Sequence, residues 1–229
     1  MVRPKRSQQH PNLQGAIKEV AKKQIAELGA ASLSLRAIAR ELSITAPAIY
    51  NYYGSRDDLV TSLIVDAYHS LAASLASASD AKQNNHTEAM LAGFRAYRSW
   101  ALEHAAEYGL IFGTPIPNYH APMELTGPAA AESMIVLIQV IDAAYREGEL
   151  NLNDIPPALE TMLLPWSEKL GYAGPLSVIN AALASWAQLH GLVSLELFGH
   201  LAPTPEHGEV DPFFEAEIQT MVERMGIKK

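Results

Sequence analysis

Hydrogen-bonding side chains are concentrated in one short segment of this chain, between residues 34 and 59. Tyr50, Asn51 and Tyr52 follow an alanine-rich stretch and carry hydroxyl and amide groups of the kind that contact phosphate oxygens or base edges. Arg36 and Arg56 lie on either side of them and carry the positive charge that a phosphate attracts. Base edges are read by an element that enters a groove, so this segment must hold the three side chains on an exposed helix.

Two short helices joined by a tight turn are predicted here. The first helix has apolar residues at i, i+3, i+4 and i+7, namely Leu35, Ile38, Ala39 and Leu42. This spacing leaves Arg36 and Arg40 on the outer side. Ser43-Ile44-Thr45 forms the turn, and the Thr45 hydroxyl can cap the helix that follows.

The second helix is predicted from Ala46 to about Tyr53. Its first turn, Ala46-Pro47-Ala48, is small enough for close approach, and Pro47 is tolerated because first-turn amides lack partners within the helix. Ile49 and Tyr53 are four residues apart and can pack inward, which leaves the polar side chains between them outside.

A third helix is predicted to begin at Ser55, after the break at Gly54. Asp58 stands three residues later as the partner in a capping box. Arg56 lies at the positive end of this helix, where the helix dipole alone disfavours a cation. Its position therefore suggests a phosphate nearby.

The segment resembles the N-terminal domain of the TetR family of bacterial transcriptional regulators. The residues that carry the resemblance are Ile38-Ala39, Ile44-Thr45, Ile49-Tyr50, Tyr52-Tyr53 and Ser55-Arg56-Asp57-Asp58-Leu59. Three positions depart from the family pattern: Ser43 replaces a common glycine, Tyr52 a common histidine and Arg56 a common lysine. A residue other than glycine at positive φ costs about 1 kcal/mol, so we expect an intact but slightly strained turn.

The resemblance implies a DNA-binding helix-turn-helix whose second helix enters the major groove. Near the base edges it places Thr45, Ala46, Pro47, Ala48 and Asn51. Phosphate contacts are then expected from Arg36, Tyr50, Tyr52 and Arg56. Three ordinary amphipathic helices are the alternative interpretation of the same pattern.

The charge distribution favours the DNA-binding interpretation independently. Residues 1–60 hold nine Lys or Arg against five Asp or Glu, and the remainder holds eight against twenty. A cationic region on an anionic protein can approach DNA only with that region first. Arg3, Lys5 and Arg6 form either a flexible arm that contacts phosphates or a solubilising tail.

The rest of the chain is predicted to be helical, so the fold class is all-α. Expected helices span about 12–28, 57–78, 87–107, 128–146, 156–170, 175–198 and 212–225, with prolines in first turns and glycines just past the ends. We expect a DNA-binding domain at 1–56 and a larger ligand-binding and dimerisation domain at 57–229, connected by one long helix. The chain has no cysteine, and we expect no secretion signal and no apolar run of membrane-spanning length, which favours the bacterial cytoplasm.

Candidate ligand-binding residues are polar or aromatic groups embedded in the apolar helices. They are Phe94, Tyr97, Trp100, His104, Tyr108, Tyr119, Trp166, Trp186 and His190. The first four lie near one helical face close to the proline-rich segment 113–128, which we interpret as a wall or lid of a small-molecule pocket. Its alternative is a plain connection, and the alternative for the aromatic residues is core packing. The run from Trp186 to Gly191 also resembles a signature of one TetR subgroup.

A homodimer is predicted from the last two helices, where apolar residues surround the whole of the first. The expected interface residues are Leu183, Ala184, Ala187, Gly191, Ser194, Phe214, Ile218, Met221 and Met225. A four-helix interface about a two-fold axis would bury them, and it is also the usual dimer of the family that the chain resembles. The alternative is that both helices are covered within one chain.

Enzyme and metal-site motifs do not occur in the sequence. It has no Gly-x-Ser-x-Gly elbow, no phosphate-binding glycine loop, no His-Glu-x-x-His motif and no cysteine nucleophile. We therefore expect no catalysis, cofactor or metal. The favoured function is a ligand-responsive repressor that binds a palindromic operator as a dimer. The competing hypotheses are a helical scaffold protein that has lost DNA binding and an all-α enzyme without a recognisable nucleophile.

Overall fold

The computed structural model describes residues 12–82, 85–201 and 212–227, and these residues form helices and connections without strands. The all-α prediction is therefore confirmed. The chain divides into two compact units, Met1–Ala67 with His104–Gly127 and Tyr68–Glu103 with Pro128–Lys229. We call them the head unit and the body unit. The basic arm of Arg3, Lys5 and Arg6 lies outside the described residues.

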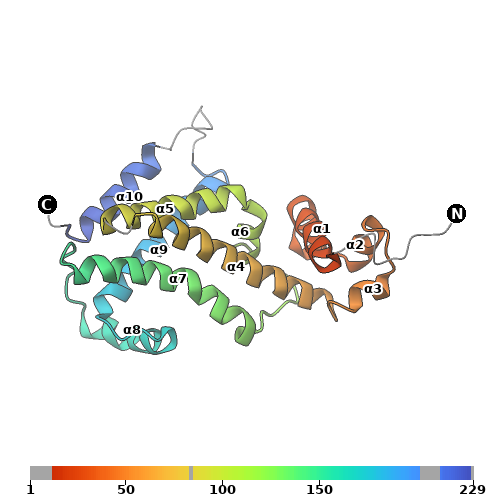
Figure 1. Ribbon diagram of the computed structural model, residues 1–229, viewed down its shortest axis with the longest axis horizontal. Helices are drawn as coiled ribbons and strands as arrows, with labels where there is room; N and C mark the ends of the chain where they lie inside the picture. Colours follow the sequence, from red (N-terminus) through yellow and green to blue (C-terminus); the bar gives the residue numbers. More distant parts are fainter. Residues whose placement is uncertain (1–11, 83–84, 202–211, 228–229) are drawn as a thin grey trace. The chain divides into compact units, whose positions relative to one another are not determined.

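The head unit is built on three short helices and the start of a long one (Figure 1). These are α1 (Leu13–Leu28), α2 (Leu35–Glu41), α3 (Ala46–Tyr50) and the first part of α4 (Arg56–Asp80). The unit also contains η2 (Ala30–Ser32), α6 (Ala105–Phe112) and the first residues of α7 (Met123–Arg146). Side chains from the first four helices form its core, with Ile17, Ala21, Ile38, Ile49 and Leu59 almost completely buried. Burial of about 25 cal/mol per Å² of apolar surface drives this packing.

Polar caps fix where the first two helices begin. Asn12 Oδ1 accepts from the Gly15 amide at 3.0 Å at the start of α1, and Ser34 Oγ accepts from the Ala37 amide at 3.3 Å at the start of α2. The buried Gln24 side chain of α1 accepts from the Ser34 amide at 3.2 Å. These contacts attach α1 to the start of α2 and so orient the helix-turn-helix.

The turn between α2 and α3 has the strained conformation that the sequence predicts. Ser43 has φ 55°, in the left-handed region that glycine adopts without cost. The Ile44 amide donates to the Ala39 carbonyl at 2.9 Å and closes the end of α2.

Two sequence predictions about α3 are wrong. Thr45 occupies the N-cap position, but its hydroxyl makes no capping hydrogen bond within the described residues. The helix ends at Tyr50 instead of near Tyr53, and Asn51 and Tyr52 form a turn after it. Since the Tyr52 and Tyr53 amides both donate to the Ile49 carbonyl, this tightened turn still leads Tyr53 back into the core.

The body unit contains the second part of α4 and the longer helices that follow. These are α5 (His86–Glu103), most of α7 (Met123–Arg146), α8 (Pro157–Leu170), α9 (Leu176–Leu197) and α10 (Pro212–Arg224). The glycines predicted just past helix ends lie there, and they adopt left-handed φ values of 72° at Gly148, 65° at Gly171 and 74° at Gly199.

Two helix boundaries differ from the sequence predictions. The helix expected over 87–107 is divided into α5 and α6 by His104, whose φ of −122° and ψ of 44° interrupt the helical backbone. Helix α7 begins at Met123, so Pro128 lies inside it and not in its first turn. The Pro122 carbonyl accepts from the Leu125 and Thr126 amides at 3.0 Å, which starts the helix before the proline that was expected to begin it.

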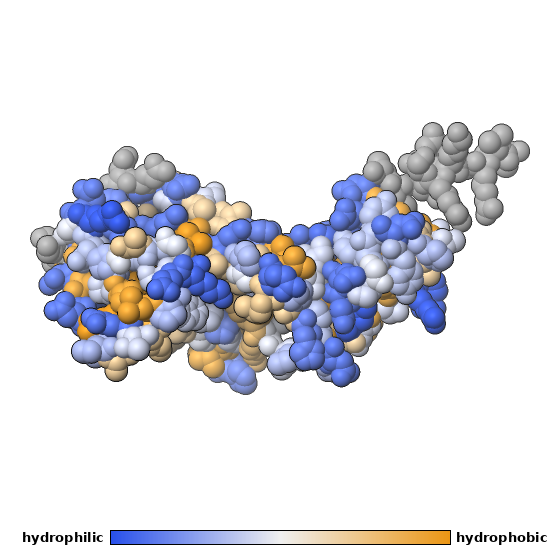
Figure 2. Space-filling model, turned by 90° about the horizontal axis from the view of Figure 1, so that it is seen from below, coloured by the Kyte–Doolittle hydropathy of each residue, from blue (hydrophilic) through white to orange (hydrophobic). Residues whose placement is uncertain are grey.

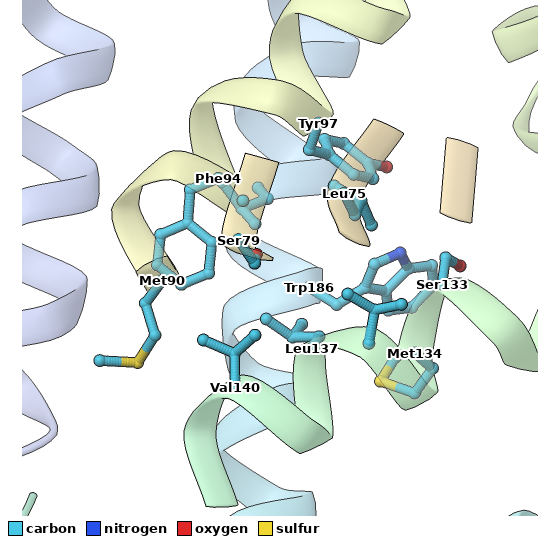
Figure 3. Close-up of a pocket in the computed structure, with 13 residues that line it drawn as sticks. Leu75, Ser79, Met90, Phe94, Tyr97, Ser133, Met134, Leu137, Val140 and Trp186 are labelled. Carbon is cyan, nitrogen blue, oxygen red and sulfur yellow. The ribbon is translucent and has the colours of Figure 1, made fainter. Parts of the chain in front are cut away.

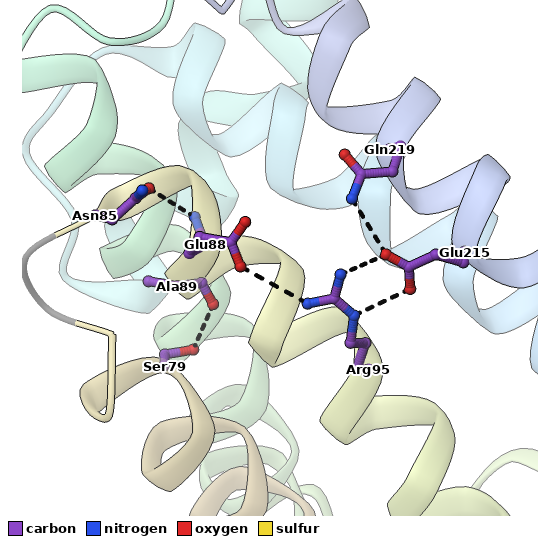
Figure 4. A network of polar contacts seen from close by, with 7 residues as sticks. All are labelled: Ser79, Asn85, Glu88, Ala89, Arg95, Glu215 and Gln219. Carbon is purple, nitrogen blue, oxygen red and sulfur yellow. Dashed lines mark hydrogen bonds and ion pairs between the residues drawn. The ribbon is translucent and has the colours of Figure 1, made fainter. Parts of the chain in front are cut away.

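Ion pairs attach α10 and α9 to α5 (Figure 4 shows the first). The Arg95 guanidinium donates to both carboxylate oxygens of Glu215 on α10, and Gln219 donates to the same carboxylate at 3.1 Å. Arg98 donates to both oxygens of Glu196 on α9, at 2.7 and 2.6 Å. The hydrogen bond from Arg95 lowers the pKa of Glu215, so the carboxylate stays charged to a lower pH than an unpaired glutamate.

Three helices are long and apolar enough, by length and composition alone, to cross a membrane: Arg56–Asp80, Met123–Arg146 and Leu176–Leu197. The expectation that no apolar stretch reaches this length is therefore wrong. Other helices bury 50%, 28% and 39% of these three stretches, so a share of their apolar residues is used in packing within the protein.

Candidate functional site

The second helix of the helix-turn-helix presents polar groups on one side and a buried face on the other. Ile49 is completely buried and Tyr53 is 4% exposed, whereas Tyr50 is 51% and Tyr52 47% exposed. Asn51 and Pro47 are also exposed. The structure thus brings together the side chains that the sequence predicts for base and phosphate contacts, on a surface that packing leaves open.

The remaining candidates for the same surface lie in the turn and on α2. Thr45 is exposed, and Ala46 and Ala48 are partly exposed. The side chains of Ala46 and Ala48 end at Cβ, so no long side chain from these two positions limits approach to the backbone. Arg36 is exposed on α2, where its guanidinium can reach outward to an anion.

Arg56 is engaged inside the head unit. Its guanidinium donates from Nη2 to the Ala30 carbonyl at 2.7 Å and to the Ala31 carbonyl at 3.2 Å, and from Nη1 to Asp57 at 3.3 Å. The side chain is 28% exposed. Arg56 therefore ties the start of α4 to η2, a role that the sequence did not indicate.

The Ser55 hydroxyl accepts from the Asp58 amide at 3.1 Å, which is one of the two hydrogen bonds of the capping box predicted at the start of α4. Tyr53 has a different position from the other tyrosines of this segment. Its hydroxyl is buried and has no hydrogen-bond partner within residues 12–82, 85–201 and 212–227. Tyr53 therefore contributes apolar packing under the exposed polar surface.

A small cavity lies in the body unit between α4, α5, α7 and α9. Its volume is about 30 Å³, and its walls are Leu75, Ser79, Met90, Gly93, Phe94, Tyr97, Ser133, Met134, Val136, Leu137, Val140, Trp186 and Leu189. Figure 3 shows Phe94 and Tyr97 of α5 on one side, Trp186 of α9 between the helices, and Met134 and Leu137 of α7 opposite. Three of the sequence-predicted ligand residues, Phe94, Tyr97 and Trp186, line this cavity.

His190 lies beside the cavity without lining it. Its Nδ1 is 3.4 Å from the Tyr97 hydroxyl, and its ring stacks on Trp186 with the ring centroids 5.4 Å apart. Burial lowers the pKa of His190, which favours the neutral imidazole. Four of the predicted ligand residues thus form one cluster.

The other five predicted ligand residues lie elsewhere. The Trp100 indole donates to Ser70 at 3.0 Å, and the buried Tyr108 ring packs against Phe112 at 5.1 Å. His104 is the N-cap residue of α6, and Trp166 is 46% exposed on α8. The Tyr119 hydroxyl is 2.9 Å from the Thr61 hydroxyl of α4.

The proline-rich segment 113–128 does not line the cavity. Through the Tyr119 and Thr61 hydroxyls it is attached instead to the first part of α4, inside the head unit. Residues 114–117 also form one side of a separate open groove whose other walls come from the end of α1, η2 and α6.

The predicted dimer residues fall into two groups. Phe214, Ile218 and Met221 of α10, and Met225 directly after it, are all buried within the chain, so they are covered without a partner. On α9, Ala184 and Ala187 are exposed, whereas Leu183, Gly191 and Ser194 are partly exposed. An apolar surface that the sequence did not single out lies on α8, where Met162 is 55% and Trp166 46% exposed.

Several cavity residues gave no signal in the sequence. Ser133, Met134, Leu137 and Val140 are spaced along one face of α7 like ordinary core residues, and Gly93 has no side chain to mark it. They can be recognised as cavity residues only when it is known that α7 lies against α4, α5 and α9. Within the described parts of the chain, no group of three or more His, Asp or Glu side chains is arranged to hold a metal ion.

Comparison with known proteins decides between the interpretations of this fold. Residues 17–63 match the description "Bacterial regulatory proteins, tetR family", and residues 90–221 match "Tetracyclin repressor-like, C-terminal domain". The HTH-type transcriptional regulators Rv1816 of Mycobacterium tuberculosis and Mb1846 of Mycobacterium bovis are each 34% identical over 198 residues, which cover 85% of this chain and 85% of each relative. The chain belongs to the TetR family of bacterial transcriptional regulators.

Solved structures agree with this membership of the TetR family. The regulatory protein SCO4313 is 34% identical, with a TM-score of 0.76 over 96% of this chain and 99% of that one. A Rhodococcus sp. RHA1 protein has the same fold, with a TM-score of 0.74, 23% identity and coverage of 96% and 99%. TetR-family regulators bind DNA, typically as dimers, and they are not enzymes.

Proposed function

We propose that this TetR-family protein is a homodimeric, ligand-responsive repressor that binds a palindromic operator in the bacterial cytoplasm. Residues 1–56 would bind DNA, and residues 57–229 would bind the ligand and the second protomer. The observation that carries the proposal is the exposed polar surface of Tyr50, Asn51 and Tyr52, supported from behind by the buried Ile49. Repression follows when the bound protein covers a promoter.

In this proposal, the side chains at the first turn and at the end of α3 contact the base edges directly. The Asn51 amide can pair with an adenine edge, and the small Ala46-Pro47-Ala48 turn allows the helix to enter the major groove. Tyr50, Tyr52 and Arg36 are the phosphate contacts in this proposal. Arg56 is assigned a supporting role, because its guanidinium already donates to Ala30 and Ala31.

We propose that the dimer uses the exposed faces of α8 and α9. Seen from the side of α8, hydrophobic residues gather over the surface that this helix occupies (Figure 2). An open groove beside α9 includes Leu159 of α8, Ala184 of α9 and Arg224 of α10, so a partner helix can approach α9 closely there. A two-fold dimer presents two identical heads, and an inverted-repeat operator matches that symmetry.

Ligand control follows from differential binding. An effector in the body unit releases the operator only if it binds the conformer with wrongly spaced heads more tightly than the DNA-bound conformer. A coupling of about 1–3 kcal/mol would change operator affinity about 5- to 150-fold.

Selection of genomic DNA fragments by the purified protein, followed by affinity measurements on the selected sequence, tests this proposal. Asn51→Ala should reduce the preference at one base pair by about 1–3 kcal/mol and leave binding to random DNA nearly unchanged. Arg36→Ala should weaken binding to every sequence and lower the slope of log K against log salt by about 1.

Arg146→Ala is the matched control, since Arg146 is an exposed arginine of the body unit and should not affect DNA binding. Equal losses on operator and random DNA for both Asn51→Ala and Arg36→Ala would contradict the division between base and phosphate contacts. Weak binding to every fragment, with no dependence on salt, would favour a scaffold protein that has lost DNA recognition.

A further inference from the structure

The cavity between α4, α5, α7 and α9 has no charged residue among its walls. Its polar groups are few, and they already contact other atoms of the protein. Ser79 Oγ donates to the Ala89 carbonyl at 3.2 Å, Ser133 Oγ donates to the Ala130 carbonyl at 3.4 Å, and the Tyr97 hydroxyl is 3.4 Å from His190 Nδ1. A charged ligand would find no counterion here, and burial of an unpaired charge is very costly.

Charged residues next to cavity residues in sequence have other partners or are exposed: Glu132 contacts His69 at 2.7 Å, and Asp80 is exposed. Arg95 and Arg98 of α5 donate to Glu215 and Glu196, respectively. His190 contacts the cavity residue Tyr97, and burial lowers the pKa of His190 and so favours its neutral form. The cavity is therefore suited to uncharged molecules.

One wall of the cavity is less tightly held than the others. Leu75 of α4, Met90, Phe94 and Tyr97 of α5, and Leu189 of α9 are buried, whereas Ser133, Met134, Val136, Leu137 and Val140 of α7 are all partly exposed. Helices α4 and α5 approach closely at Gly93, where an added Cβ would lie 3.0 Å from Ser79 Oγ. The side of α7 is thus the one through which a ligand can enter.

The volume of about 30 Å³ holds no more than about one water molecule, so a ligand must displace side chains. Met90 and Met134 suit this requirement, because an unbranched thioether side chain can adopt several shapes at little cost. Trp186 and Phe94 offer aromatic faces for contact with a ring or an alkyl chain.

The effector of the proposed function would bind in this cavity, and we propose that it is an uncharged, mostly apolar molecule that enters past α7 and directs at most one polar group toward Tyr97 and His190. That the bound molecule controls DNA binding rests on the proposed regulatory function. The binding chemistry does not, because it can be measured without DNA.

Two fluorescent probes that differ by one charge test the proposal on the full-length protein. N-phenylnaphthylamine is neutral, and anilinonaphthalenesulfonate has the same rings with a sulfonate added. The neutral probe should bind saturably, with one site per chain, and at least ~10-fold more tightly than the sulfonate, because the anion would be buried without a partner.

Met134→Lys should reverse this preference. A lysine at this partly exposed position places a cation at the cavity wall, so affinity for the neutral probe should fall and affinity for the sulfonate should rise, a change of ~10-fold or more in their ratio. A partly unfolded protein would bind the sulfonate on exposed apolar surface, so the sulfonate must still saturate at one site per chain and the near-ultraviolet circular dichroism must match wild type. Met123→Lys is the matched control, since Met123 is 62% exposed at the start of α7 and lies outside the cavity.

Val140→Phe is a second variant, which should fill the cavity and weaken the neutral probe at least ~10-fold while the helical circular dichroism is unchanged. The proposal is overturned if the neutral probe does not saturate, if the sulfonate binds as tightly, or if Met134→Lys leaves the ratio unchanged. Failure of operator selection, with the probe results as expected, would overturn the regulatory function and leave the binding chemistry standing.

Discussion

Ser43 is strained in the turn between α2 and α3. Its φ of 55° is costly for any residue with a Cβ and free for glycine. The turn is held by the hydrogen bond that the Ile44 amide donates to the Ala39 carbonyl. The surrounding helices therefore impose this conformation on an exposed serine.

Ser43→Gly should raise the free energy of unfolding by about 0.5–1 kcal/mol, because the relief of strain exceeds the extra entropy that glycine gives the unfolded chain. Urea titration followed by circular dichroism measures this change. Ser43→Ala, which keeps the Cβ, should show no gain. A gain of the same size for alanine would show that strain at φ is not the cause.

Tyr53 gives a second prediction at this scale. Its buried hydroxyl has no partner among the described residues, so Tyr53→Phe removes a desolvated polar group and no hydrogen bond. The unfolding free energy should stay equal or rise by up to about 1 kcal/mol. Tyr53→Leu should instead lose aromatic packing and destabilise by about 1–3 kcal/mol. Destabilisation by Tyr53→Phe of more than 1 kcal/mol would reveal a partner for the hydroxyl.

Single residues were predictable where the cause is local. The strain at Ser43, the cap at Ser55 and the inward position of Ile49 follow from spacing and backbone chemistry alone. The role of Arg56 did not, because its acceptors Ala30 and Ala31 are carbonyls more than 20 residues away, and carbonyls give no signal in a sequence.

At the scale of helices, prolines and glycines predicted ends more reliably than beginnings. Gly148, Gly171 and Gly199 end helices as expected, since each adopts a left-handed φ. Pro128 misled the prediction for α7, because the Pro122 carbonyl starts the helix one and a half turns earlier. The break at His104 has no proline or glycine to mark it, so α5 and α6 were predicted as one helix.

The attachment of α10 to α5 should depend on pH. The Arg95 hydrogen bond lowers the folded-state pKa of Glu215 below the ordinary value, so the contact adds stability above that ordinary pKa. This stability is lost as pH falls through the lowered folded-state pKa. Glu215→Gln should therefore reduce the unfolding free energy at pH 7 by about 1 kcal/mol or less, given the partial exposure, and the difference from wild type should shrink as the pH falls below the ordinary pKa of glutamate.

Glu223→Gln is the control for this experiment, because Glu223 is an exposed carboxylate on the same helix. Its effect on the unfolding free energy should be close to zero at every pH. A difference for Glu215→Gln that stays constant from pH 7 to pH 3 would contradict the role of the charged pair.

At the scale of the whole molecule, the pairing of protomers is the property that local sequence patterns predict least well. Helix α9 is apolar all round, which correctly indicates that it is covered on several sides. The pattern does not indicate which elements cover it. The structure covers the apolar face of α10 within the chain and leaves Met162 and Trp166 of α8 exposed. A sequence pattern cannot separate contacts within one chain from contacts between two.

Trp166→Glu should disrupt the dimer, because it places a charge in the centre of the proposed α8 interface. A loss of about 2–4 kcal/mol in association is typical for such a central aromatic residue. Sedimentation equilibrium should then give a monomer at micromolar concentration, with the helical content unchanged. Leu102→Glu alters a leucine of α5 with 40% exposure and should leave a dimer. A wild-type protein that is already a monomer would contradict the proposed interface.

Operator binding by a dimer is tested most directly by two affinities measured at moderate salt. One is for an inverted-repeat operator, and the other is for a scrambled duplex of the same length and composition. We expect two chains to bind each operator duplex, and the operator to be preferred by at least ~10³-fold. Equal affinity for the two duplexes, or failure to select any inverted repeat, would contradict this expectation.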